Sequence, residues 1–208
     1  MLIAPVETGF QVYAGVSWAT QNLSPWPGGQ MPIAEPVSNR AGYKLLEALA
    51  TFEIRLRKGD HALDLGASPG AWTTLLRRRG LRVTAVAPTP LYPWLAVDND
   101  VSYQALRAEE FLTRCQTKFD LIVNDMKLDP QDSARLMVDY AQHLRHEGIA
   151  IMTLKLRSRN QARVMDHAFR LLRRSYKIIR VRQLVSNGDE VTLFLRRKSS
   201  QSAFDRTG

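Results

Sequence analysis

Short apolar runs alternate with longer amphipathic segments along most of the chain. Four of the apolar runs have the length and the aliphatic content of strands. They are residues 61–65, 82–86, 119–124 and 148–154. Apolar positions that recur every three to four residues predict helices near 70–80, 131–146 and 160–174. Strands that alternate with helices need crossover connections, so the pattern predicts a parallel sheet covered by helices on both faces.

The two flanks of this pattern add a helix and a hairpin. A helix is expected from Ser38 onward, where apolar residues recur at helical spacing. Strands are expected near 176–185 and 190–196, and the Asn187-Gly188 pair between them suits a tight reversal of antiparallel neighbours. The expected fold is therefore α/β, with a mostly parallel, seven-stranded sheet that ends in a C-terminal antiparallel hairpin.

Composition divides the chain into three regions. Residues 1–37 contain five of the ten prolines and two of the four tryptophans, which favours an extended N-terminal arm packed on the body. In this arm, apolar side chains at every second position from Val12 to Trp18 predict a strand. Residues 38–197 are expected to form the folded domain, and residues 198–208 a flexible tail.

Charge and cysteine content narrow the class of protein. The formal net charge of +9 favours attraction to a polyanion, which leaves RNA, DNA and an anionic membrane open. A single cysteine, Cys115, excludes an internal disulfide and any multi-cysteine zinc site, so no structural metal is expected. The sequence has neither a secretion signal nor an apolar run long enough to span a membrane, and we expect a cytoplasmic protein.

The most specific local feature is the segment Asp64-Leu-Gly-Ala-Ser-Pro-Gly-Ala-Trp72, which follows a predicted strand and leads into a helix. Gly66 and Gly70 allow the backbone to approach a ligand beyond the carboxyl end of the strand. The spacing is not that of a dinucleotide loop, and the lysine of a phosphate loop is absent. A nucleotide-like ligand without a pyrophosphate fits best, and the alternative is a turn that merely joins strand to helix.

This segment resembles the cofactor loop of the FtsJ-type RNA ribose 2′-O-methyltransferases. The resemblance implies a Rossmann-like methyltransferase fold and S-adenosylmethionine as the cofactor. It also implies that Asp64 orders the loop and the methionine end of the cofactor, and that Asp125 lies near the transferred methyl group. The cofactor contacts that it implies in the loop are Asp64, Gly66, Ala67, Ser68, Pro69, Gly70 and Trp72.

Enzymes of this family also carry a scattered Lys-Asp-Lys-Glu set, and the sequence offers a candidate for each member in the right order and element. They are Lys44, Asp125, Lys155 and Glu190. Taken alone, Lys44 could be a solvated helix lysine, Asp125 a turn cap and Glu190 an edge-strand charge. Lys155 is less ordinary because it interrupts an apolar run that should be a buried strand.

The chemistry of ribose methylation explains these residue types. A hydroxyl group is a poor nucleophile at neutral pH, so a base must lie within hydrogen-bond reach of it. A lysine can serve if burial or a neighbouring cation lowers its pKa from about 10.4. We assign Lys155 as the base and Lys44 as the residue that tunes it and orients the ribose. Asp125 is expected to orient Lys155, and Glu190 to position Lys44 or the ribose.

Within the family, the sequence is more similar to the bacterial enzymes that methylate a cytidine 2′-hydroxyl of 23S rRNA, over roughly residues 20–197. Those enzymes carry a long N-terminal RNA-binding region, whereas about twenty residues precede the resemblance here, so the exact target is not carried over. The second strand should end in an acidic residue that holds the cofactor ribose, but Ala87 stands there. Glu109 matches a position that contacts the adenine.

A basic surface is expected beside the predicted catalytic residues. Residues 154–182 contain ten lysines and arginines against one acidic residue, although part of this charge could simply be a solvated helix face. The residues predicted to bind RNA are Arg40, Arg157, Arg159 and Asn160. Ribose must enter a pocket, so unpaired RNA, from ribosomal RNA or a ribosomal particle, is the expected partner. Trp94 or Tyr43 could stack on a base, but core packing is expected for each.

Two other functions stay open from the sequence. One is a noncatalytic RNA- or ribosome-binding protein that kept the fold, which Ala87 would explain and the complete Lys-Asp-Lys-Glu set opposes. The other is a methyltransferase that acts on a small molecule or a base. Binding of S-adenosylmethionine would distinguish an enzyme from the noncatalytic RNA-binding protein. The activity of Lys155→Ala would distinguish a ribose methyltransferase, which should lose activity, from a methyltransferase that acts on a small molecule or a base, which should keep it.

Overall fold

The computed structural model describes residues 2–6, 9–13, 40–156 and 160–199. The chain divides into two compact units, Met1–Ala34 and Glu35–Gly208. In the first unit, strands β1 (Leu2–Val6) and β2 (Gly9–Tyr13) pair antiparallel. The strand expected over residues 12–18 therefore begins earlier, and most of it lies outside the described residues, as do the rest of the expected arm and residues 200–208 of the expected tail.

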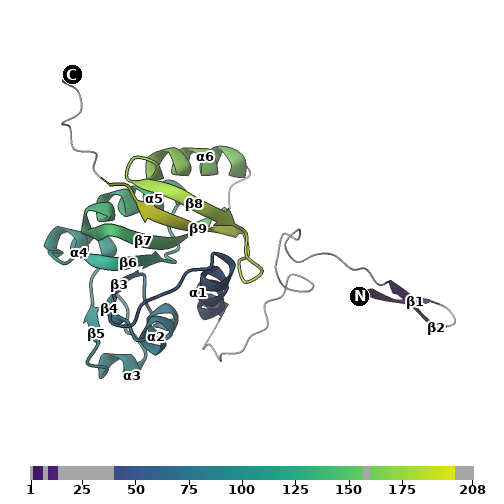
Figure 1. Cartoon of the computed structure of the whole chain (residues 1–208), viewed down its shortest axis with the longest axis horizontal. Coiled ribbons are helices and arrows are strands. Elements are labelled where there is room, and N and C mark those ends of the chain that lie inside the picture. The colour runs from purple at the N-terminus through teal and green to yellow at the C-terminus, as the bar shows by residue number, and fades with distance from the viewer. Residues whose placement is uncertain (1, 7–8, 14–39, 157–159, 200–208) are drawn as a thin grey trace, which may run out of the picture. The chain divides into compact units, whose positions relative to one another are not determined.

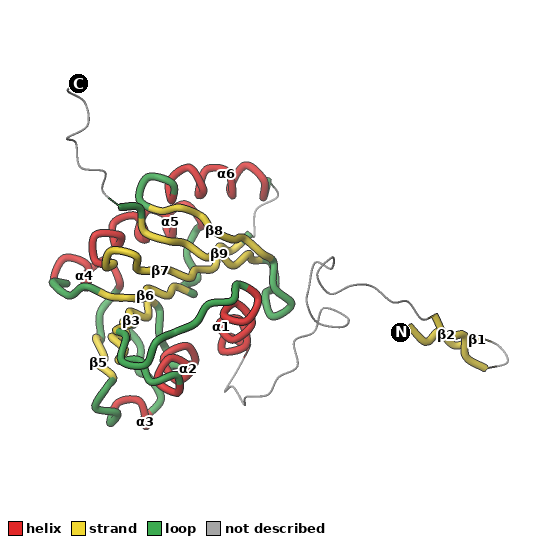
Figure 2. The backbone as a smooth tube through the Cα atoms, in the orientation of Figure 1, coloured by secondary structure: helices red, strands yellow, loops and turns green. Residues whose placement is uncertain are grey.

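The second unit contains the predicted alternation of helices and strands (Figures 1 and 2). Its helices are α1 (Arg40–Thr51), α2 (Ala71–Arg78), α3 (Pro93–Ala96), α4 (Ala108–Arg114), α5 (Pro130–Tyr140) and α6 (Gln161–Leu172). A 3₁₀ turn (Ala141–His143) directly follows α5. Its strands are β3 (His61–Leu65), β4 (Arg82–Val86), β5 (Val101–Gln104), β6 (Phe119–Asn124), β7 (Leu144–Lys155), β8 (Tyr176–Arg182) and β9 (Glu190–Arg197).

These strands form one seven-stranded sheet in the order β5-β4-β3-β6-β7-β9-β8. The first five are parallel, and β9 runs antiparallel to both β7 and β8, which confirms the predicted parallel sheet with a C-terminal hairpin. Crossovers from β3 move the chain toward β5 and then back past β3 to β6. Because crossovers are right-handed, this change of direction across the sheet puts the helices that precede β5 and the helices that follow it on opposite faces. On one face α1 packs on α2, and on the other α5 packs on α6 (Figure 1).

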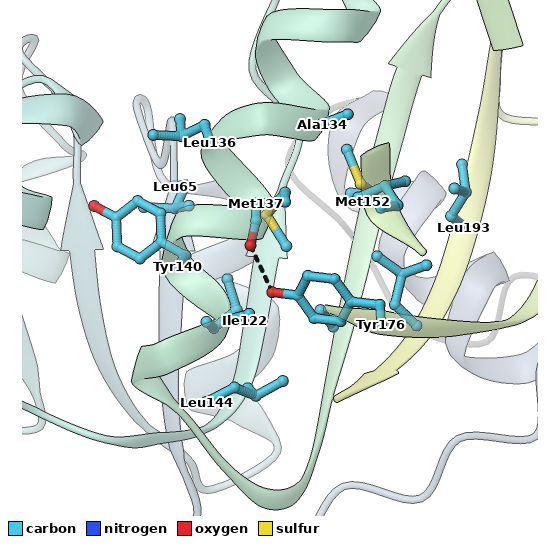
Figure 3. Packing of buried hydrophobic residues seen from close by; sticks show 14 of the residues in the cluster. Leu65, Ile122, Ala134, Leu136, Met137, Tyr140, Leu144, Met152, Tyr176 and Leu193 are labelled. Carbon is cyan, nitrogen blue, oxygen red and sulfur yellow. Dashed lines mark hydrogen bonds between the residues drawn. The ribbon is translucent and has the colours of Figure 1, made fainter. Parts of the chain in front are cut away.

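A large cluster of buried hydrophobic residues lies between the sheet and the α4–α6 layer. Aliphatic side chains of the central strands are fully buried there, among them Leu65, Ile122 and Met152 (Figure 3). Two buried tyrosines place their hydroxyl groups on helix carbonyls. Tyr176 donates to Met137 at 2.7 Å, as Figure 3 shows, and Tyr140 donates to the carbonyl of residue 108 at 2.6 Å. A polar group this deep needs a partner, so the Tyr176 bond fixes α5 on strand β8 of the sheet and the Tyr140 bond fixes α5 on α4.

Two expected boundaries were wrong. The helix expected over 131–146 ends at Tyr140, because Leu144 already pairs with Phe119 and starts β7. The expected tight reversal is a longer loop, residues 183–189, which we call the β8–β9 loop. A two-residue reversal needs positive φ angles, which Gly188 does not have.

Candidate functional site

A tight loop joins the end of β3 to the start of α2. Gly66 and Gly70 have φ angles of +76° and +117°, which glycine adopts without steric cost. The Gly66 and Ala67 amides donate to the carbonyl of Val86 in the neighbouring strand, at 2.9 and 3.2 Å. β3 lies between β4 and β6, where the chain changes faces, and the loop is thus at the edge where α/β sheets bind ligands.

Asp64 lies near the carboxyl end of β3 and is 2% exposed. Its Oδ2 accepts a hydrogen bond from Thr73 Oγ1 at 2.6 Å. Burial raises the pKa of Asp64 to about 7, against the effect of the Thr73 hydrogen bond and with a further contribution from the negative charge of Asp125. A buried carboxyl group in this state gains strongly from a cationic ligand group such as an ammonium.

Other predicted contacts of the loop have partners within the protein. Ser68 Oγ donates to the Pro90 carbonyl at 2.9 Å, which fastens the segment after β4 to the loop. Trp72 is 3% exposed, and its indole donates to the Ala41 carbonyl of α1 at 2.5 Å. Trp72 thus supports the loop from the side of α1 and presents little surface to a ligand.

The end of β4 has no acidic side chain to offer. Ala87 is buried there, and its carbonyl accepts a hydrogen bond from the Tyr103 hydroxyl at 3.1 Å. Glu109 is exposed in the first turn of α4. Contacts of Ala87 and Glu109 with a cofactor stay predictions.

Four charged side chains from distant parts of the sequence meet next to this loop. They are Lys44 of α1, Asp125 just after β6, Lys155 at the end of β7 and Glu190 at the start of β9, and we call them the tetrad. Met126, which follows Asp125, packs so closely on Gly66 that a Cβ there would be 2.4 Å from its Cγ. The tetrad and the loop therefore border the same end of the sheet.

The tetrad forms a closed set of ion pairs. Lys44 Nζ lies 2.5 Å from Glu190 Oε1 and 3.1 Å from Asp125 Oδ2. Lys155 Nζ lies 2.5 Å from Asp125 Oδ1 and also pairs with Glu190 Oε2. Lys155 and Glu190 face each other in the β7–β9 register, which explains how residues so far apart in sequence meet. The four side chains are only 9–16% exposed.

The electrostatics differ from the expectation of two lysines that repel each other's charge. Each ammonium contacts both carboxylates, so opposite charges separate the two lysines. Burial lowers the pKa of Lys44, but hydrogen bonds and charges from Glu190 and Asp125 outweigh it and hold the pKa above its ordinary value. For Glu190, burial is outweighed by the two lysines, which hold its pKa below the usual range.

The tetrad opens into a pocket of about 470 Å³. Its other lining residues are Arg40, Ala41, Lys127, Gly188 and Asp189. This volume is typical of small-ligand sites, and the charged floor gives the pocket an acid, a base and an ion-pair network in one place. The arrangement suits proton transfer to or from a hydroxyl group that reaches one of the lysines from the pocket.

The residues predicted to bind RNA have different outcomes. Arg40 lines the pocket, and its guanidinium also donates to backbone carbonyls of the β8–β9 loop. Arg157 and Arg159 lie outside the described residues, and Asn160 is exposed just before α6. RNA binding by these residues stays a prediction.

The expected core packing of Trp94 was wrong, because Leu95 takes the buried position of the short helix α3. Trp94 is 55% exposed and stacks on Tyr92, with ring centroids 4.4 Å apart. Tyr43 is half-buried on α1.

Three residues of the site were missed from the sequence. Thr153 Oγ1 accepts a hydrogen bond from Lys155 at 2.6 Å and donates one to Asp125 at 2.6 Å. Its signal was strand periodicity, since residues two apart share one face of a strand. Lys127 is an exposed cation on the pocket wall, and Glu47 is a buried carboxylate on α1.

Within residues 40–156 and 160–199 and the β1–β2 hairpin, no three His, Cys, Asp or Glu side chains converge as metal ligands would. The described helices are all too short or too polar to cross a bilayer.

Known proteins match the chain over most of its length. The family model of the FtsJ-like methyltransferases matches residues 37–200. The ribosomal RNA large subunit methyltransferase M of Halorhodospira halophila is 39% identical over 186 residues, which are 85% of this chain and 53% of that protein. The protein of the same name from Azoarcus is 33% identical over 208 residues, 92% of this chain and 54% of that protein. The chain thus spans about half the length of these relatives.

Solved structures agree on the fold. Methanococcus jannaschii fibrillarin, a pre-rRNA processing protein, superposes with a TM-score of 0.60 at 17% identity, over 75% of each chain. The N-methyltransferase NodS of Bradyrhizobium japonicum superposes with a TM-score of 0.56 at 17% identity, over 76% of this chain and 95% of that one. Both have the Rossmann-like methyltransferase fold that the sequence predicts. Together with the family match over residues 37–200, this identifies the chain as a member of the FtsJ-like methyltransferase family.

Proposed function

We propose that this chain transfers a methyl group from S-adenosylmethionine to a ribose 2′-hydroxyl of RNA, and that the RNA is ribosomal. The observation that carries the proposal is the tetrad, which brings two lysines and two carboxylates together at a pocket beside the glycine loop. The names of the relatives, ribosomal RNA methyltransferases, support the substrate class. A ribosomal substrate would place the reaction in the cytoplasm.

The residues near β3 fit the cofactor at its methionine end. Asp64 offers a buried carboxyl group for the cofactor's ammonium, and the backbone of Gly66 to Gly70 offers close approach. At the adenosine end the side chain of Ala87 supplies no acceptor for the ribose hydroxyls, so binding depends more on the loop and Asp64. When bound, the cofactor supplies a methyl group on a sulfonium that is ready for displacement.

Lys155 is the group to which we assign the ribose proton. It donates hydrogen bonds to Asp125, Thr153 and Glu190, which accounts for all three donors of an ammonium. As an ammonium, Lys155 must therefore release one proton to solvent before its amine can accept the proton of the 2′-hydroxyl, and it ends the transfer as an ammonium again.

The other tetrad members hold the acceptor in line. Lys44, fixed between Glu190 and Asp125, stays protonated and can donate a hydrogen bond to the ribose. Asp125 holds both Lys155 and Thr153, so the base points into the pocket. Such fixed orientation of donor and acceptor contributes much of the rate in methyl transfer.

The charge around the pocket suits an RNA strand. Lys127 and Arg40 stand on its wall, and the chain carries a formal net charge of +9. Cations at the mouth of a pocket contact phosphates on either side of the nucleotide that enters, and such contacts weaken as salt rises.

The test is a transfer assay with labelled S-adenosylmethionine and unmodified large-subunit ribosomal RNA. After digestion to nucleosides, mass spectrometry should place the methyl group on the ribose fragment rather than on the base. Lys155→Ala should lower the transfer rate by about a hundredfold or more, because that is the usual contribution of a general base. Its affinity for the cofactor, measured by calorimetry, should stay close to that of the wild type.

Lys58→Ala removes an exposed lysine outside the pocket and serves as the matched control, with unchanged transfer expected. A methyl group on a base, or full activity of Lys155→Ala, would contradict ribose methylation through Lys155. Absence of cofactor binding at millimolar concentration would contradict a methyltransferase that depends on S-adenosylmethionine.

A further inference from the structure

The β8–β9 loop is held on α1 by a buried carboxylate. Glu47 is 4% exposed, and each of its oxygens accepts a backbone hydrogen bond. Oε1 accepts from the Val185 amide and Oε2 from the Ser186 amide, both at 2.8 Å. A buried carboxylate needs such donors to offset its lost hydration, so Glu47 and the loop depend on each other.

Arg40 binds the same loop through the opposite backbone groups. Its Nε donates to the Ser186 carbonyl at 3.2 Å and its Nη2 to the Asn187 carbonyl at 2.9 Å. Gly188 leaves room for this contact, because a Cβ there would be 3.2 Å from Nη2. Glu47 and Arg40 together therefore satisfy two amides and two carbonyls of consecutive loop residues.

The β8–β9 loop is also hydrogen-bonded to residues at and beside the tetrad. The Asn187 side chain donates to the Glu190 carbonyl at 3.2 Å and to Thr192 Oγ1 at 3.0 Å. The Asp189 carbonyl accepts from the Leu156 amide at 2.6 Å, just beyond Lys155. Residues 185–190 are thus connected without a break from α1 to the start of β9.

Helix geometry links these contacts to Lys44. Positions 40, 44 and 47 lie on one face of an α-helix, four and three residues apart. This face therefore presents Lys44 to Glu190 and, on either side of it, Arg40 and Glu47 to the loop that leads into Glu190. Figure 2 shows the β8–β9 loop beside α1.

We propose that Glu47 and Arg40 are positioning residues that hold the β8–β9 loop on α1 and thereby keep Glu190 against Lys44. The expected effect on methyl transfer rests on the proposed function, whereas the attachment of the loop to α1 and of Glu190 to Lys44 does not depend on it. The two residues do not touch the reacting atoms. They set the distance between two tetrad members that come from opposite ends of the folded unit.

The test compares Glu47→Ala and Glu47→Gln in the full chain. Loss of the carboxylate should release Glu190, so the pKa of Lys44, followed by NMR of the labelled lysine side chain, should fall toward or below its ordinary value. Amide hydrogen exchange at residues 185 and 186 should become at least tenfold faster. The single-turnover transfer rate should fall at least tenfold in Glu47→Ala, with the cofactor Kd within twofold of the wild type.

The glutamine of Glu47→Gln keeps one oxygen that accepts from a loop amide, but its NH₂ group would face the other loop amide, which is also a donor. Its effects on the Lys44 pKa, on amide exchange and on the transfer rate should therefore lie between those of the wild type and Glu47→Ala. Leu49→Val is the matched control, since it weakens packing of the same helix at a buried position whose side chain can form no hydrogen bond with the loop. Its Lys44 titration should be that of the wild type. If Glu47→Ala leaves the Lys44 titration unchanged, or if its rate falls only as far as that of Leu49→Val at equal melting temperature, the positioning role is wrong.

The readouts also separate this inference from the proposed function. A wild-type chain that transfers no methyl group to RNA, yet shows the Lys44 and exchange responses, would refute the function and support the attachment. A wild-type chain that is active, with a Lys44 titration that ignores Glu47, would support the function and refute the attachment.

Discussion

The raised pKa of Asp64 predicts that ionisation of this carboxyl group destabilises the cofactor-free protein increasingly from about pH 4 to about pH 7, and by a constant amount above. The difference between an ordinary value of 3.8 and about 7 corresponds to about 4 kcal/mol in favour of the neutral form. Between these pH values the folded chain binds more protons than the unfolded chain. The stability that Asp64 contributes is therefore complete below about pH 4 and is lost as pH rises to about 7.

Asp64→Asn should remove this dependence, because an amide has nearly the shape of the carboxyl group and carries no charge at any pH. About 3 kcal/mol of the effect falls between pH 5 and pH 8. Urea unfolding of the wild type and the variant at both pH values gives the double difference. Relative to the wild type, the free energy of unfolding of Asp64→Asn should increase by about 3 kcal/mol between pH 5 and pH 8. The same difference should be zero for Asp139→Asn, an exposed control.

Binding of S-adenosylmethionine should reverse the effect, since its ammonium favours the ionised carboxylate. Its affinity for the wild type should rise from pH 6 to pH 8, and its affinity for Asp64→Asn should be weak and independent of pH in that range. Equal pH dependence of unfolding in the wild type and in Asp64→Asn would refute the reasoning, because no proton could then be assigned to this buried group.

Three further substitutions test the backbone of the loop after β3, a buried hydrogen bond and a phosphate contact. Gly66→Ala should cost about 1–2 kcal/mol in urea unfolding and weaken cofactor binding, because of its positive φ and the clash with Met126; an unchanged midpoint would contradict this. Tyr176→Phe should cost about 1–3 kcal/mol in thermal unfolding, because it leaves the buried Met137 carbonyl without its donor, and an equal stability would be unexpected. Lys127→Ala should weaken RNA binding and reduce the slope of log affinity against log salt by about 1, and an unchanged slope would exclude a phosphate contact.

The fold could be predicted where the sequence carries local signals. Buried parallel strands need continuous apolar runs, so residues 61–65 and 119–124 were found with their observed bounds. The glycines of the loop and the polar residues at strand ends also stand out, because such residues are uncommon next to buried strands. Lys155, at the end of an apolar run, is the clearest case.

Features set by tertiary contacts could not be predicted in this way. Glu47 reads as part of a solvated helix face, and only the docking of the β8–β9 loop buries it. The end of α5 is set by the pairing of Leu144 with Phe119 across the sheet. The charge balance of the tetrad likewise depends on distances between four elements, which no spacing in the sequence determines.

The position of β9 has a consequence for the synthesis of the protein. This strand comes last in the sheet along the chain, yet it lies between β7 and β8 and brings Glu190 to residues made much earlier. A nascent chain emerges amino end first, so the ion-pair cluster cannot close until β9 has left the ribosome. A product that is terminated before β9 would contain the loop after β3 but not Glu190, so the tetrad is complete only when the chain has been made through β9.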